Sequence, residues 1–155
     1  MKNNPLRRAL VAAAAVFLGL VGAAAPVHAG MLSATRPVIA ILDGELFVGV
    51  AEGHLDGAGT LAIHSRKNPA LTCQGDFTSS AKLGGSGSLR CTDGGNATFS
   101  FKRLNVFRGH GAGTTSRGSM SFVYGLSAAE SARYLQLPGG KKFGEDGNEL
   151  TLVDE

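Results

Sequence analysis

The strongest constraint on the fold is a period-two alternation of apolar and polar residues in many short runs. Ala97, Phe99 and Phe101 alternate with polar side chains, and residues 119–124 repeat the pattern. This alternation is typical of half-buried β-strands. Asp43-Gly44 and residues 93–96 are turn signals between such runs. We therefore predict an all-β domain of seven or eight short antiparallel strands, arranged as a sheet, a roll or a small barrel.

Glycine is unusually frequent in these runs, with 23 residues in a chain of 155. Three signatures of alternating glycine recur, at Gly57-Ala58-Gly59, Gly85-Ser86-Gly87 and Gly111-Ala112-Gly113. Glycine at alternate positions removes side chains from one face of a strand, so a neighbouring strand or an aromatic ring can approach closely. The spacing predicts one hairpin-like unit that recurs three times.

The first of these units resembles a known repeat. Phe47-x-Gly49, followed by Gly53-His54 and Gly57-x-Gly59, resembles a degenerate MORN repeat, the glycine-rich β-hairpin unit of membrane occupation and recognition nexus proteins. The resemblance covers residues 46–125 and implies an interaction role, as a scaffold or a lipid-contacting surface. The chain also resembles small exported proteins of Gram-negative bacteria. Neither resemblance assigns a function to a particular residue.

The first 29 residues have the order of a signal peptide. Lys2, Arg7 and Arg8 precede an apolar run, and Val27-His28-Ala29 is a small-residue cleavage site. The alternative is a membrane anchor, which needs about 20 strongly apolar residues. We predict an exported protein, periplasmic or secreted, with no transmembrane span after cleavage. Loss of the three cations leaves twelve basic against twelve acidic residues, which argues against a nucleic-acid partner.

The mature chain has two cysteines, Cys73 and Cys91. An even number of cysteines in an exported protein indicates a disulfide. The alternation in residues 71–77 and 89–92 places both sulfur atoms on the buried face of their strands. We predict a Cys73–Cys91 disulfide; the alternative is a pair of buried, reduced thiols.

The end of the chain changes character. Ser127 and Glu130 have the spacing of a capping box, which predicts a short helix at about 127–135 that packs against one mouth or edge of the sheet. Pro138-Gly139-Gly140 ends it, and residues 139–155 hold five acidic side chains after the last cation. We predict a β domain with this helix over residues 30–138 and a flexible acidic tail over residues 139–155.

No motif with a chemistry of its own occurs, and we predict no catalytic residues, no cofactor and no metal. A hydrolase could use His110 with Asp56 or Ser119, but no G-x-S-x-G nucleophile motif is present. A metal site could use His54, Asp56 and His64, although histidines on strands and turns are usually surface residues. The prediction is a non-enzymatic protein.

Two binding functions remain. The favoured hypothesis is an interaction module for an envelope protein or an anionic surface. The alternative is a barrel that carries a small apolar ligand among its Phe and Leu side chains. The candidate binding surface for the first hypothesis consists of four cations, Lys102, Arg103, Arg108 and Arg117.

Overall fold

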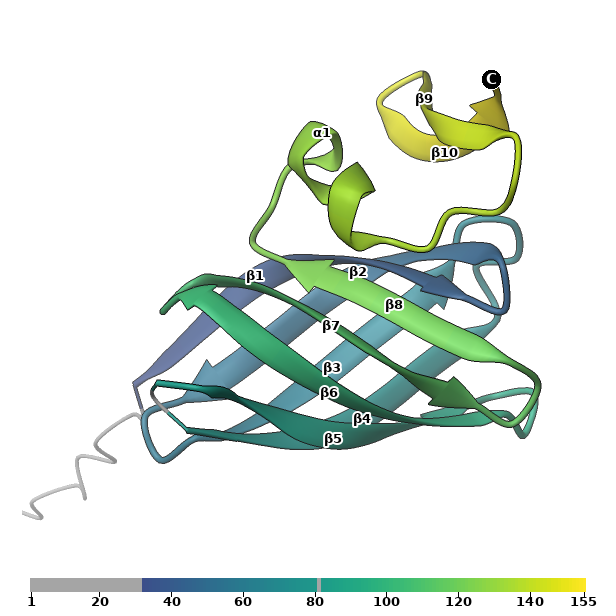
Figure 1. Ribbon diagram of the computed structural model, residues 1–155. Helices are drawn as coiled ribbons and strands as arrows, with labels where there is room; N and C mark the ends of the chain where they lie inside the picture. Colours follow the sequence, from purple (N-terminus) through teal and green to yellow (C-terminus); the bar gives the residue numbers. More distant parts are fainter. Residues whose placement is uncertain (1–31, 81) are drawn as a thin grey trace, which may run out of the picture.

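A computed structural model describes residues 32–80 and 82–155. Eight antiparallel strands close into a barrel in which each strand pairs with the next and β8 pairs with β1 (Figure 1). The all-β prediction is confirmed, in its barrel form. The strands are β1 (Ser33–Leu42), β2 (Glu45–His54), β3 (Ala58–Ser65), β4 (Thr72–Ser80), β5 (Gly84–Cys91), β6 (Asn96–Asn105), β7 (Arg108–Thr115) and β8 (Ser119–Tyr124).

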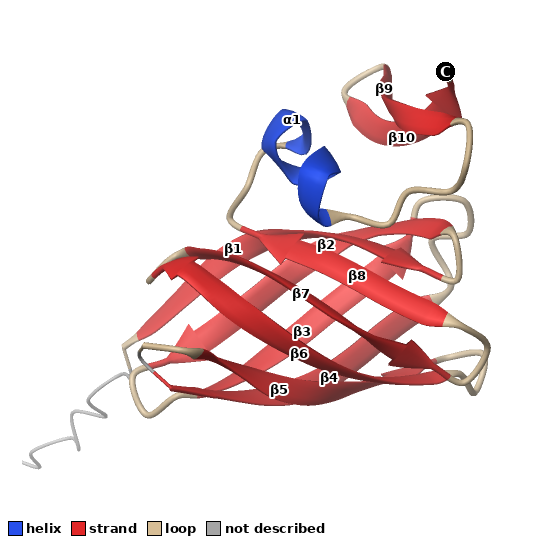
Figure 2. Ribbon diagram, viewed as in Figure 1, coloured by secondary structure: helices blue, strands red, loops and turns tan. Residues whose placement is uncertain are grey.

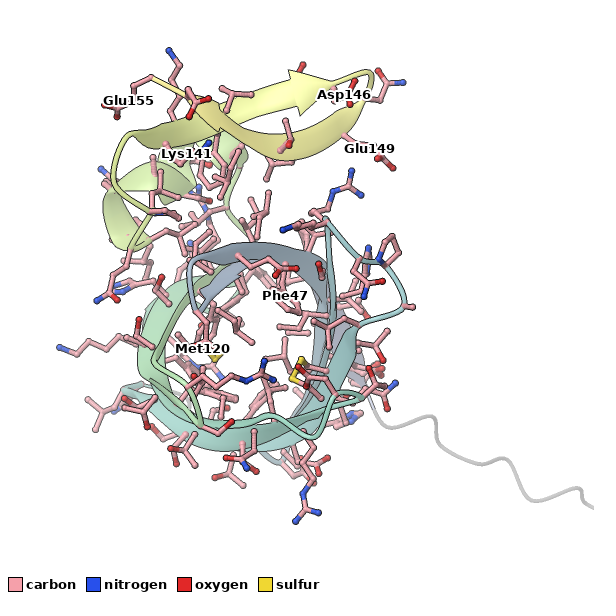
Figure 3. The ribbon with its side chains drawn as sticks, turned by 90° about the vertical axis from the view of Figure 1, so that its right-hand side faces the viewer. Phe47, Met120, Lys141, Asp146, Glu149 and Glu155 are labelled. Atoms are coloured by element: carbon pink, nitrogen blue, oxygen red, sulfur yellow. A yellow bond between two sulfur atoms is a disulfide. The ribbon has the colours of Figure 1, made fainter. Side chains whose placement is uncertain are left out.

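The predicted turns and alternation account for this closure. Asp43 and Gly44 both have positive φ, 52° and 80°, as a two-residue hairpin turn of the favoured handedness requires. On every strand alternate side chains point inward. The inward set forms one core inside the barrel, in which Phe47 and Met120 are 4% and 0% exposed. Figure 3 shows both residues inside the ring of strands.

A disulfide joins Cys73 of β4 to Cys91 of β5, as predicted. The two residues are direct partners in the β4–β5 register, and Cys73 is fully buried. The bridge therefore ties β4 to β5 at the end of this hairpin opposite its turn, on the inner side of the barrel, and its yellow bond is visible in Figure 3.

The predicted helix is present, but it packs against the outer wall of the barrel rather than across its mouth. It comprises α1 (Ala128–Ser131) and a 3-10 turn, η1 (Ala132–Tyr134), and the Ser127–Glu130 capping box is formed (Figure 2). Leu126 and Leu135 join the outward side chains of β1, β2 and β8 in a second core. These outward side chains are Ile39, Ile41, Leu46 and Val123.

The prediction of a flexible tail over residues 139–155 is wrong. This segment holds a hairpin of β9 (Lys141–Asp146) and β10 (Glu149–Asp154). Its apolar side chains, Phe143, Leu150 and Leu152, pack against the second core. Arg66 pairs with Glu149 and donates a hydrogen bond to the Leu150 carbonyl oxygen at 3.0 Å. The acidic segment is thus held by the barrel's outer wall (Figure 1).

The predicted signal peptide lies outside the described residues. Within residues 32–80 and 82–155, no helix is both long and apolar enough to span a membrane.

Glu130 makes the stability of the helix region dependent on pH. It pairs with Arg108 and accepts hydrogen bonds from Ser127, and these contacts, the Arg108 bond foremost, lower its pKa from 4.5 to about 2. Because the pKa is lower in the folded protein, the ionised Glu130 carboxylate stabilises the fold above pH 4.5. This stabilisation is lost as the pH falls toward 2 and the carboxylate is protonated. We expect the unfolding free energy of the wild type to fall more steeply than that of Glu130→Gln across this interval. Denaturant unfolding at a series of pH values checks this, and parallel curves for the two proteins would contradict it.

Candidate functional site

The barrel contains a cavity of about 480 Å³ at one end. We call this the mouth end. Here β1, β3, β5 and β7 begin and the other four strands end, on the left in Figure 1. Inward side chains such as Leu61, Phe99 and Phe122 line the interior of the cavity, and loop residues such as Leu55 and Phe107 line its opening. A volume of this size is within the range of about 300–1,000 Å³ that is usual for small-molecule sites.

The distribution of side-chain size along the strands explains why the cavity lies at this end. Large inward side chains fill the opposite, closed end, including Leu42, Ile63, Leu89 and Met120. At the mouth end the inward positions of β2, β3, β5 and β7 hold small residues instead, among them Ala51, Gly53, Gly59, Gly87 and Gly109. The barrel is therefore packed at one end and hollow at the other.

The glycine signatures and the aromatic rings occupy alternate strands. The glycines are on β3, β5 and β7, and the rings are on β4, β6 and β8. A Cβ atom at Gly59 would overlap the ring of Phe77, and one at Gly111 would overlap the ring of Phe122. The rings can therefore lie flat across neighbouring strands, where they form an apolar wall.

Exposed apolar side chains surround the opening. Leu55, in the β2–β3 turn, and Leu83, before β5, are 80% and 81% exposed. Val106 and Phe107 of the β6–β7 turn and Leu32, before β1, are also exposed. Large side chains of this kind are costly in water, and their grouping around an apolar cavity indicates a contact surface.

Two arginines stand at the same opening. Arg103 donates hydrogen bonds to the carbonyl oxygens of Ser80 and Val106, both at 3.1 Å, and to Ser79 Oγ at 2.8 Å. The guanidinium of Arg36 lies 4.3 Å from the centre of the Phe107 ring. Both cations therefore meet the β6–β7 turn. Among the described residues, neither forms a salt bridge with a carboxylate.

Two buried polar atoms at the mouth end have no hydrogen-bond partner among the described residues: the hydroxyl of Tyr124 and Nδ1 of His54. Both residues line the cavity. Burial raises the pKa of the Tyr124 phenol, although the charge of Arg103 opposes this. The phenol therefore keeps its proton at neutral pH and can donate a hydrogen bond. Most buried polar groups in folded proteins are satisfied, so these two mark a place where a polar ligand atom could bind.

The four cations of the predicted binding surface do not form one patch. Arg103 points into the mouth, whereas Lys102, its neighbour on β6, points outward. Arg108 pairs with Glu130 against the outer wall. Arg117 is in the β7–β8 turn at the closed end, where it pairs with Asp93.

The histidines that were considered for catalysis or metal binding are apart. The ring of His110 stacks on Tyr134, with 4.4 Å between centroids. Ser119 pairs with Thr114, four residues along β7 from His110. His54 is at the mouth end and His64 is near the opposite end of β3. Within the described part of the chain, no group of three or more His, Cys, Asp or Glu residues could hold a metal ion.

Arg36 is the site residue that the sequence reasoning missed. The first strand begins at Ser33. Extending the inward series Val38 and Ala40 two residues toward the N-terminus reaches Arg36. A cation on the apolar face of a strand was the signal that could have found it.

No protein-family model matches the chain, and no curated protein or solved structure shows significant similarity to it. The resemblance to MORN repeats therefore stays a prediction.

Proposed function

We propose that this is an exported carrier that binds a small apolar molecule in the mouth end of the barrel. One observation carries the proposal: a cavity of about 480 Å³ with an aromatic and aliphatic wall opens at a rim of exposed apolar side chains. Burying apolar ligand surface against such a wall contributes roughly 25 cal/mol per Å². The exposed apolar side chains of the rim can contact an apolar ligand as it enters the barrel, so that the ligand is only partly exposed to water on its way in.

Export is part of the proposal and rests on the sequence of residues 1–29. The Cys73–Cys91 disulfide supports it, because such bonds persist mainly in oxidising compartments. The alternative of a basic interaction surface has less support, since two of its four cations are in ion pairs and one of these two is at the closed end.

The proposal is tested by filling the cavity. Ala51 faces inward and lines the cavity, whereas Val50, the preceding residue on β2, faces outward and is 46% exposed. We expect Ala51→Phe to weaken binding of N-phenylnaphthylamine, an uncharged apolar fluorescent probe, by at least about tenfold, because the new ring occupies the ligand's space. Val50→Phe is the matched control and should bind as the wild type does.

Fluorescence titration of the three purified proteins measures these affinities. Thermal unfolding of each variant first establishes that it is folded. Equal affinity in all three proteins would place the probe outside the cavity and contradict the proposal, as would the absence of binding to the wild type.

A further inference from the structure

The charged groups of the cavity indicate what kind of molecule it takes. Three charged side chains line the cavity: Arg36, Arg103 and Asp56. The Asp56 carboxylate accepts a hydrogen bond from the Ala58 amide at 2.9 Å, within its own turn. The cavity lining therefore carries one net positive charge when His54 is neutral. A ligand with a single negative charge would complement it.

Arg103 is held in place before any ligand binds. Its three hydrogen bonds fix the guanidinium to the C-terminal end of β4 and to the β6–β7 turn. An arginine has five N–H donors in a planar fork, so two remain for a ligand. A cation fixed in this way loses little side-chain entropy on binding.

Arg36 approaches the same turn from β1. Its guanidinium lies over the Phe107 ring, and the one hydrogen bond that it makes within the described residues, at 2.8 Å, goes to the carbonyl oxygen of Thr35. Most of its N–H donors are therefore unused by the described residues. A guanidinium fork matches the two oxygens of a carboxylate better than an ammonium group does.

Tyr124 adds a neutral donor beside Arg103. Arg103 and Tyr124 both pair with Gly109, on opposite sides of β7. Because Gly109 has no side chain, the Tyr124 ring crosses β7, and a Cβ atom there would overlap its hydroxyl. The absence of a side chain at Gly109 thus lets the Tyr124 hydroxyl, which has no hydrogen-bond partner among the described residues, approach Arg103.

We propose that the ligand is a linear monocarboxylate whose apolar chain lies inside the barrel and whose carboxylate binds between Arg36 and Arg103 at the mouth. This inference rests on the proposed carrier function and specifies its ligand class. The apolar wall accepts the chain, and the two guanidinium groups distinguish a carboxylate from an uncharged head group of the same length.

The test compares dodecanoate with dodecanol, which have the same chain length, by displacement of N-phenylnaphthylamine. We expect dodecanoate to bind the wild type at least about tenfold more tightly than dodecanol, since hydrogen bonds to charged groups are among the stronger ones. In Arg36→Met the preference should fall to about threefold or less, while dodecanol affinity is retained.

Lys102→Met is the matched control, because it removes the cation next to Arg103 that points away from the cavity. It should leave the preference for dodecanoate unchanged. Arg103→Met is the second variant. It removes the arginine's three hydrogen bonds together with its charge, so its affinity for dodecanol is measured as well. Retained dodecanol affinity would show that the mouth is still formed.

Equal binding of dodecanoate and dodecanol to the wild type would overturn the monocarboxylate inference and leave the carrier function standing. An equal loss of preference in Lys102→Met and Arg36→Met would also overturn it, since the overall surface charge would then be responsible. Failure of the probe and of both amphiphiles to bind would instead overturn the carrier function itself.

Discussion

Replacing both cysteines with alanine is expected to lower the free energy of unfolding by about 3 kcal/mol. The bridge joins residues 18 apart in sequence, and its loss lets the unfolded chain explore conformations in which β4 and β5 are separated. Alanine is preferred to serine as the replacement, because Cys73 is fully buried and a hydroxyl there would need a hydrogen-bond partner.

Denaturant unfolding of Cys73→Ala/Cys91→Ala and of the wild type in oxidising buffer measures this difference. The wild type in reducing buffer is the control and should lose a similar amount, since the described chain has no free cysteine to complicate the comparison. Unfolding of the double variant and the oxidised wild type at the same denaturant concentration would contradict the prediction.

Gly75→Ala is expected to destabilise the barrel by about 1–3 kcal/mol, because it forces two backbones apart. Gly75 points inward on β4, and a Cβ atom there would overlap the carbonyl oxygen of Ser88 on β5. Backbone atoms cannot rotate out of the way as a flexible side chain can. The whole β4–β5 pairing must therefore shift to accept a single methyl group.

Gly139→Ala is the matched control for this substitution. Apart from atoms of residues 138–140, no heavy atom would lie within 4 Å of its new Cβ, and its φ is not positive. The control variant should unfold at the same denaturant concentration as the wild type. If Gly75→Ala is as stable as Gly139→Ala, the close approach of β4 and β5 is not a property of the folded protein.

The barrel's wall could be predicted from the sequence because its signals are local. Alternation of apolar and polar residues, the Asp43-Gly44 turn and the Ser127–Glu130 capping box depend on neighbouring residues, and the structure contains all of them. The pairing of Cys73 with Cys91 follows from the same alternation, since it places both residues on inward faces.

The hairpin of residues 141–154 could not be predicted in the same way. Its strands are short and acidic, and a local reading of them favours a solvated tail. Phe143 and Leu152 are half-buried against side chains of β1, β2 and β8. The first two of these strands are about a hundred residues earlier in the chain, and β8 comes just before the helix. Long-range packing of this kind overrides local composition.

A ligand-carrying barrel was one of the two binding functions that the sequence left open, but the position of the cavity could not be predicted. A glycine row predicts close packing of strands, and that role is confirmed where rings lie over Gly59 and Gly111. Which end of the barrel remains hollow depends on the register of all eight strands. Small residues face one another at the mouth end only once β2 and β3 pair Gly53 with Gly59.

Mapping of amide NMR chemical shifts during titration with dodecanol tests most directly whether the barrel interior is a ligand site. The account predicts that the shifts concentrate on the inward residues of the mouth end, among them Ala51, Gly53 and Phe101, and spare the hairpin of β9 and β10. Shifts confined to the outer wall or to the closed end, or no shifts at saturating dodecanol, would contradict it.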